Sequence, residues 1–425
     1  MNTVTEPAAR HSSLAPFRVR SFRFQWPADL TTSWALEMET LILGWWVLVE
    51  TESVLWLTLF GSLQFIGTLV APMLGVLGTR LGFRTVLCTL RIIYTVKAAV
   101  MMVLALSGLL ELEYVFALAI VMGIVRPSDL VMRNALVGQT MPPALLSGAM
   151  SVSRTTTDSA RVAGALVGAG MVATLGMGFA YIAITCFYAV SFALTLGVAR
   201  APPGVDRADG ERAAAQRTSP WRDLRDVFAY VWNTPHLLAA MCLAFLVNLT
   251  AFPITSGLLP FVAKDIYNSG QTGLGYLAAS FAFGALLGSL ILSRNGNWVM
   301  CGRMMIGFSA AWYVGLLVFV QFDTPTLGLP ILIIAGCVQS FALVPMSVLM
   351  IRGSDERHRG GVLGLRMLAV YGLPVGLVAA SPLIENYGLP TMVSVYVFIG
   401  LTTIAFISWR WHDAVWSKDS PANKR

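Results

Sequence analysis

Acidic and basic side chains stand inside long apolar stretches of this 425-residue sequence. The charged residues placed there that could do chemistry are Glu37, Glu39, Arg126, Asp129, Arg133, Arg154, Asp158 and Arg161. Apolar surroundings raise the pKa of a carboxyl group and nearby arginines lower it, so such carboxylates suit reversible protonation. Arginines suit the binding of anionic groups. These residues therefore indicate proton exchange and ion binding.

Six of these charges repeat at helical spacing. The members of one set are Arg126, Asp129 and Arg133, and those of the other are Arg154, Asp158 and Arg161. At about 100° per residue each set forms one narrow stripe. Because the two helices are expected to run in opposite directions, the stripes would lie at equal depth and could form a ladder of ion pairs. The ladder could lock the helices together or line a wet cavity, and poor stabilisation by buried ion pairs favours the cavity.

Glu37 and Glu39 are two residues apart, about 200° around a helix, so both cannot face one cavity. One is expected to take the proton or contact the substrate, and the other to pack against a neighbouring helix, with Lys97 as its partner. Arg91 is expected to extend to the cytoplasmic edge. All four histidines lie at or beyond the expected membrane edges, so no histidine relay is predicted.

The second half of the sequence carries few charges inside its apolar stretches. Asn248 is a cavity candidate because a mid-membrane amide needs a hydrogen-bond partner. Arg366 fits a cavity role and a position at the cytoplasmic edge equally well.

Composition places these residues in a membrane. The chain is 56% hydrophobic and 12% charged, with mean hydropathy +0.71, against about 25% charged residues in soluble proteins. The net charge of +7 comes from scattered basic residues, so nucleic acid is not expected as a partner. The five dispersed cysteines indicate neither disulfides nor a metal site, and no cofactor is expected.

Roughly twenty apolar residues cross a bilayer, and the sequence predicts an all-α integral membrane protein with twelve spans. The predicted spans are 28–49, 54–77, 84–108, 114–139, 147–173, 178–198, 237–261, 272–293, 302–321, 327–350, 361–384 and 389–409. The expected domains are an N-terminal tail (1–26), a six-helix bundle (27–199), a linker (200–234), a second six-helix bundle (235–410) and a C-terminal tail (411–425). An amphipathic helix is expected at 221–232 in the linker.

The positions of lysine and arginine predict the orientation. With the N-terminus inside, the inner loops carry nearly all the loop cations, and the outer loops carry only Lys264. By the positive-inside rule, both termini and the linker are cytoplasmic. We expect the chain in the inner membrane of a bacterium.

Several motifs resemble the major facilitator superfamily. Residues 75–84, GVLGTRLGFR, are similar to its G-x-x-x-D-R-x-G-R-R loop signature, with Thr79 at the acidic position. Residues 161–168, RVAGALVG, resemble its antiporter motif, with Ala165 in place of the usual proline. Segments 129–135, 248–261 and 359–365 resemble the branch that contains enterobactin-type siderophore exporters and macrolide and tetracycline antiporters.

This resemblance implies two six-helix bundles that rock about a central site. It implies gating by Gly75, Arg80, Gly82 and Arg84, and close helix packing at Gly164 and Gly168 where the bundles meet or pivot. Without the acid at Thr79, Arg80 and Arg84 are expected to pair with helix C-termini or linker acids, and the resting protein to favour an inward-open state.

The resulting hypothesis is a monomeric, proton-coupled secondary transporter that exports a small siderophore-like, drug-like, anionic or zwitterionic molecule. The alternatives are an uptake symporter or a lipid flippase of the same fold. The sequence contains no Walker loop and no motif of a catalytic site, so an ATPase or another enzyme is not predicted. The expected partners are the substrate, protons and membrane lipid.

Overall fold

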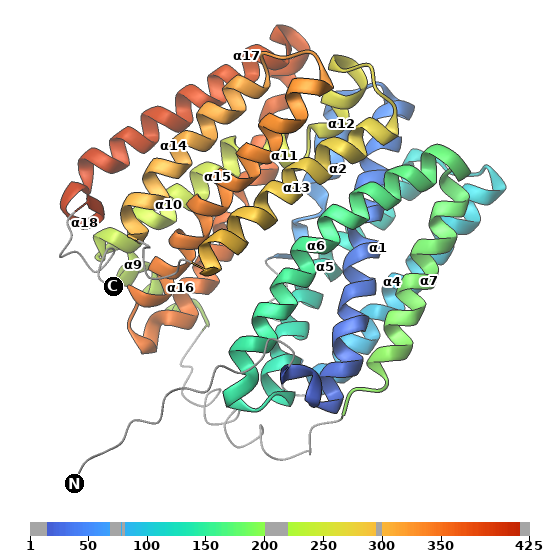
Figure 1. The fold of residues 1–425 in the computed structure, drawn as a ribbon, viewed down its shortest axis with the longest axis horizontal. Coiled ribbons are helices and arrows are strands. Elements are labelled where there is room, and N and C mark those ends of the chain that lie inside the picture. The colour runs from blue at the N-terminus through green and yellow to red at the C-terminus, as the bar shows by residue number, and fades with distance from the viewer. Residues whose placement is uncertain (1–14, 69–77, 79–80, 200–219, 295–299, 417–425) are drawn as a thin grey trace.

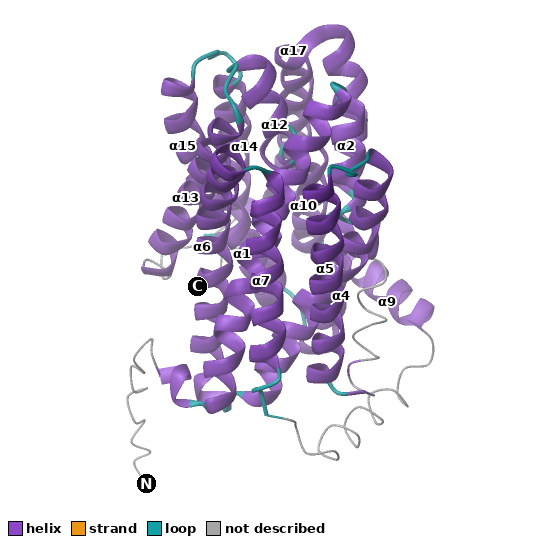
Figure 2. Cartoon of the chain, turned by 90° about the vertical axis from the view of Figure 1, so that its right-hand side faces the viewer, coloured by secondary structure: helices purple, strands orange, loops and turns teal. Residues whose placement is uncertain are grey.

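The computed structural model describes residues 15–68, 78, 81–199, 220–294 and 300–416. All regular elements within these ranges are helical (Figure 2). The first half of the described chain contains η1 (Ala15–Arg18), α1 (Arg20–Thr51), α2 (Val54–Leu63), η2 (Ile66–Thr68), α4 (Phe83–Ser107), α5 (Leu112–Thr140), α6 (Pro143–Leu175) and α7 (Met177–Thr195).

The second half begins with α9 (Pro220–Trp232), α10 (Pro235–Thr250), α11 (Phe252–Ser256), α12 (Leu259–Phe261) and the π-helix η3 (Val262–Ile266). It continues with α13 (Gln271–Arg294), α14 (Cys301–Phe319), α15 (Pro325–Arg352), α16 (Glu356–Ala369), α17 (Gly372–Arg410) and α18 (His412–Trp416). Figure 1 shows α1–α7 in blue to green beside α10–α18 in yellow to red. The expected linker helix is present as α9.

Local chemistry explains several helix ends. Gly176, with φ 84° and ψ 170°, separates α6 from α7 in a conformation that is essentially restricted to glycine. Pro235 and Pro325 each open a helix, where the missing N–H costs nothing. The apolar faces of the helices then pack into two main cores. One core draws on α1–α7, with Tyr94 and Tyr188 among its buried residues, and the other draws mainly on α10–α17, around Trp312.

Seven of the described helical segments are long and apolar enough to cross a membrane, or eight if α9 and α10 form one broken span. The predicted count of twelve spans is therefore not confirmed. Residues 358–410 are one of the seven segments, although Gly388 (φ 79°) breaks the helix there. Helices α1 and α6 are not among the seven, and they carry many of the charges singled out above.

The two halves meet along α6 and α13 and along α2 and α17. A methyl group added to Gly275 of α13 would lie 3.0 Å from the Ala165 carbonyl oxygen of α6, so these backbones are in close contact. Ser62 donates a hydrogen bond to the Pro374 carbonyl oxygen at 3.2 Å, and Lys264 donates one to that of Leu48 at 3.3 Å. Leu48 lies near the C-terminal end of α1, so the contact with Lys264 lies at the end of the molecule away from the start of that helix.

Candidate functional site

Helix α1 organises the charged residues of the first half. It packs against α6 on one side and α7 on another, and it also contacts α2 and α5. Asp29, Glu37 and Glu39 project from it into three different sets of partners. The Asp29 and Glu39 sets join α1 to α4, α5 and α7, and the Glu37 set joins it to α5 and α6.

The first set, called here the buried quartet, consists of Asp29, Arg91, Asp129 and Arg133. Arg91 forms an ion pair with Asp29, and its Nε lies 4.0 Å from Asp129 Oδ1. Arg133 lies 2.5 Å from Asp129 and 3.5 Å from Asp29. All four side chains are at most 7% exposed. Two positive and two negative charges thus balance inside the protein.

Further hydrogen bonds hold the quartet in place. Arg133 donates to Ser33 Oγ at 2.9 Å, and Arg91 donates to the Thr195 hydroxyl. Gln25 donates to the Arg133 carbonyl oxygen at 3.0 Å. Each charge of the quartet thus has an ion-pair partner, as buried charges require, although Arg91 Nε, Arg133 Nε and Asp129 Oδ1 form no hydrogen bond. The quartet therefore ties α1, α4, α5 and α7 together.

The second set is centred on Glu39. Lys97 Nζ lies 2.5 Å from its Oε2, and both side chains are almost completely buried. Tyr188 and Tyr181 donate hydrogen bonds to the same carboxylate at 3.0 and 3.4 Å. The stacked rings of Tyr94 and Tyr188 lie under the ammonium group. Glu39 is therefore the packing partner of Lys97 that the sequence predicted for one of the two glutamates.

The third set is centred on Glu37 and is accessible. Arg126 Nη2 lies 3.3 Å from Glu37 Oε1, and Arg161 Nε lies 3.8 Å from the same oxygen. Glu37 is 23% exposed, Arg126 29% and Arg161 52%. Arg126 also donates hydrogen bonds to Gln64 at 3.0 Å and to Thr40 at 3.3 Å. Two arginines from different helices thus share one carboxylate that solvent can reach.

The expected ladder between the two stripes is not formed. Asp129 pairs with Arg133 on its own helix, and Asp158 pairs with Arg154 on its own helix at 3.2 Å. Within the described ranges, no ion pair connects α5 directly to α6. The reason is that both helices pack against α1, so Arg126 and Arg161 meet at Glu37 rather than facing acids on each other.

Two members of the quartet were not foreseen. Arg91 was expected at the cytoplasmic edge, but its side chain is fully buried and paired. Asp29 was passed over because it lies at the edge of the first predicted span. Its spacing of four residues from Ser33 and eight from Glu37 is the signal that could have identified it, since these positions follow one side of a helix.

The remaining candidates lie outside these three sets. The side-chain amide of Asn248 donates a hydrogen bond to the Ala244 carbonyl oxygen of its own helix at 2.8 Å. Gly75 and Arg80 lie outside the described residues. Gly82 (φ 87°) precedes α4, and Arg84 donates to the Leu196 carbonyl oxygen at 2.6 Å, near the C-terminal end of α7. This is one of the two kinds of contact expected for Arg84.

Gly164 and Gly168 form close contacts within the first half. A methyl group at Gly164 would lie 2.8 Å from Glu37 Cβ, and one at Gly168 would lie 3.0 Å from Met38 Cα. They were expected where the two bundles meet, whereas the structure places them against α1. Because Gly164 lies directly beside Glu37, it lets α6 bring Arg161 to the carboxylate.

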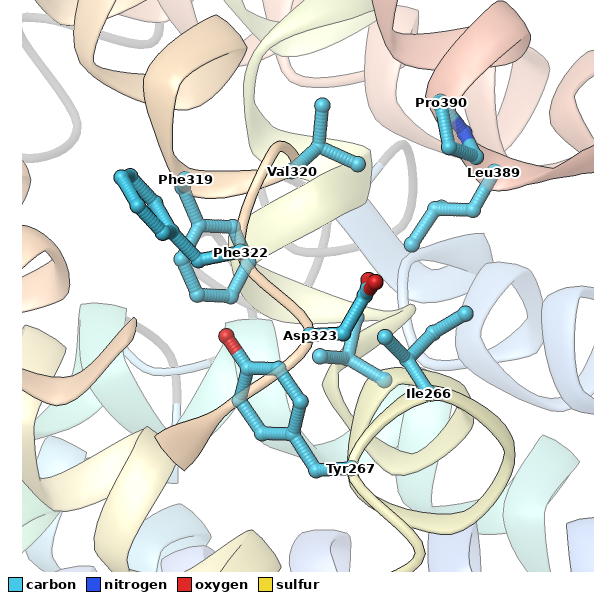
Figure 3. Close-up of a pocket in the computed structure, with 9 residues that line it drawn as sticks. Ile266, Tyr267, Phe319, Val320, Phe322, Asp323, Leu389 and Pro390 are labelled. Carbon is cyan, nitrogen blue, oxygen red and sulfur yellow. The ribbon is translucent and has the colours of Figure 1, made fainter. Parts of the chain in front are cut away.

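A small pocket lies far along the chain from these charges. It has a volume of about 20 Å³. Figure 3 shows Asp323 and Tyr267 at this pocket among apolar side chains of η3, α14 and α17. This volume holds about one water molecule, so an organic substrate would not fit. Over the residues that the structure describes, no group of three or more His, Cys, Asp or Glu side chains could hold a metal ion.

Comparison with known proteins gives a family match. The model of the Major Facilitator Superfamily matches residues 43–379. Macrolide efflux protein A of Streptococcus pyogenes is 22% identical over 215 residues, which are 49% of this chain and 51% of that protein. The chain thus spans about half the length of the curated relatives it matches.

Solved structures share the fold along almost the whole chain. The D-xylose-proton symporter has a TM-score of 0.71 at 11% identity, covering 93% of this chain and 98% of that one. The human organic anion transporter MFSD10 has a TM-score of 0.64 at 18% identity, covering 92% and 99%. The nucleoside transporter NupG has a TM-score of 0.67 at 14% identity, covering 92% and 98%.

Proposed function

This chain belongs to the Major Facilitator Superfamily, and on that premise we propose that it exports a small organic zwitterion in exchange for protons. It is a membrane transporter and not an enzyme. The proposed substrate carries an ammonium group and an anionic group, as a drug-like or siderophore-like molecule can. The transported molecule crosses by alternating access between the two halves.

The observation that carries this proposal is the position of Glu37 between Arg126 and Arg161. A coupling carboxylate must exchange protons with water and must also meet the substrate. Glu37 is partly exposed, whereas Glu39 and the quartet are enclosed by their partners. We therefore assign coupling to Glu37 and helix-packing roles to Glu39, Asp29 and Asp129.

The direction of coupling follows from the charges. An ammonium group on the substrate competes with a proton for the Glu37 carboxylate, and such competition produces antiport. The anionic group of the substrate can bind Arg161, whose side chain is half-exposed, or Arg154, which is 73% exposed. The similarity to a macrolide efflux protein supports export.

Symport is the second candidate, and the same site favours it for a different substrate. Protonation of Glu37 would release Arg126 and Arg161 from their shared carboxylate. An anion without an ammonium group would then bind together with the proton, as symport requires. The fold likeness to a D-xylose-proton symporter is compatible with this alternative.

We further propose the topology predicted from the sequence, with twelve spans in two six-helix bundles and both termini in the cytoplasm. Leu48 lies near the C-terminal end of α1, and Lys264 of the second half donates a hydrogen bond to it. On this topology that contact is at the extracellular side, which we propose is closed in this conformation. We place the protein, as a monomer, in the inner membrane of a bacterium.

The proposal is tested by flux into proteoliposomes under an imposed pH gradient. The panel contains macrolides, zwitterionic metabolites and organic anions. Wild-type protein is expected to accumulate at least one amine-bearing compound against its gradient, and Glu37→Gln to lose the dependence on pH. Glu50→Gln is the matched control, because it removes the same charge from an exposed position on the same helix. Equal pH dependence in Glu37→Gln and wild type would overturn the assignment of coupling to Glu37.

A further inference from the structure

A wide apolar groove lies on the second half, away from the charged sets of the first half. Its volume is about 860 Å³, within the range of about 300–1,000 Å³ typical of ligand pockets. The groove is bounded by α9, α10, α16 and the second part of α17. Phe245 of α10 and Ile399 of α17 line it and are exposed.

Helix α9 closes one end of this groove at a steep angle. It bends by 106° from α10, so it runs across the end of that helix instead of continuing it. Phe228 and Trp232 stack on each other, line the groove and remain exposed. A helix lying across a membrane span, with aromatic residues on its apolar face, is typical of the membrane interface.

Arg225 is the charged residue of the groove lining. It lies one helical turn before Phe228 on α9, is exposed and forms no ion pair in the part of the chain that the structure describes. One end of an otherwise apolar groove thus carries a positive charge at the interface. That combination matches an acyl chain joined to an anionic headgroup.

We propose that this groove binds one anionic phospholipid of the cytoplasmic leaflet. An acyl chain lies along Phe245 and Leu249 of α10, and the phosphate group is bound by Arg225. The negative charge of the cytoplasmic leaflet attracts cations at this depth and supplies the ligand. The site lies apart from Glu37, so it does not depend on the identity of the transported substrate.

Native mass spectrometry of the purified full-length chain tests this site. Protein in detergent is mixed with equal amounts of phosphatidylglycerol and phosphatidylcholine, and the bound lipids are counted. Wild-type protein is expected to retain phosphatidylglycerol in preference, and Arg225→Gln to reduce this preference by about fivefold, the effect of one cation near an anionic surface. Arg20→Gln, which removes an exposed cation from the first turn of α1, should leave the preference unchanged.

A second pair of variants tests the groove itself. Thr403→Phe adds bulk to a residue of the lining and should lower the binding of both lipids. Thr402→Phe adds the same bulk to the exposed neighbour outside the lining and should leave binding unchanged. Equal retention of the two lipids by wild-type protein, or an unchanged preference in Arg225→Gln, would overturn the proposal. Unchanged binding in Thr403→Phe would also overturn it, because the groove would then not hold the lipid.

Discussion

Arg133 and Asp129, one helical turn apart on α5, form an ion pair with a distance of 2.5 Å. Arg133 also donates a hydrogen bond to Ser33 Oγ of α1 at 2.9 Å. The pair therefore faces α1 and not α6. On α6, Asp158 pairs with Arg154, whose side chain is 73% exposed. Two pairs with the same spacing on neighbouring helices thus both have a buried aspartate, but the arginine is buried in the first pair and exposed in the second. This difference leads to a direct test.

Asp129→Asn is expected to destabilise the protein by about 3–5 kcal/mol, because Arg91 and Arg133 would stay buried with only Asp29 as a carboxylate partner. Arg154→Gln should destabilise the protein less, because Arg154 is itself 73% exposed and the glutamine amide can still donate a hydrogen bond to Asp158, whose side chain is only 10% exposed. The free energies of unfolding of the two variants and of wild-type protein, measured in mixed detergent micelles, give the two losses. Similar losses in the two variants would show that burial does not separate the two pairs.

Substrate affinity should rise or fall with pH, depending on the charge of the ligand. If Glu37 is the proposed coupling carboxylate, an amine-bearing ligand competes with protons for it and should bind more tightly as pH rises. An anion without an amine should instead bind together with the proton, next to Arg126 and Arg161, and bind more tightly as pH falls. Isothermal titration calorimetry across a pH series measures both trends. Glu37→Gln should remove both, and two ligands with the same trend in wild-type protein would contradict this account.

Gly275→Ala should open the contact between α6 and α13, which lies on the outer side in the proposed topology. Its added methyl group would lie 3.0 Å from the Ala165 carbonyl oxygen, which α6 cannot move without moving its backbone. A cysteine introduced at Ser62, in a chain without its native cysteines, reports the change through labelling by a membrane-impermeant maleimide. Labelling is expected to increase severalfold.

Gly270→Ala provides the control for that experiment, because an added methyl group there meets no atom within 4 Å. Its labelling should match that of the parent chain. If Gly275→Ala leaves labelling at the parental level as well, the contact between α6 and α13 does not hold the outer side closed.

The class of protein and the helices that carry charge follow from local sequence patterns alone. Apolar runs and charge spacing are local properties, so they identified a helical membrane protein, the linker helix α9 and the charged stripes on α5 and α6. They also limited the partner of Lys97 to one of two glutamates, because 200° of helical rotation separates Glu37 from Glu39.

Which charges meet depends on how the helices pack against one another. The stripes on α5 and α6 were expected to pair with each other, but α1 packs against both helices and supplies Glu37 to Arg126 and Arg161. Asp29 and Arg91 are 62 residues apart in the sequence, and no local pattern brings them together. Helical periodicity sets the direction of a side chain relative to its own axis, whereas its partner depends on which helix packs there. That choice is made by the sum of many apolar contacts between helices, so the enclosed and exposed carboxylates could be distinguished only in the folded protein.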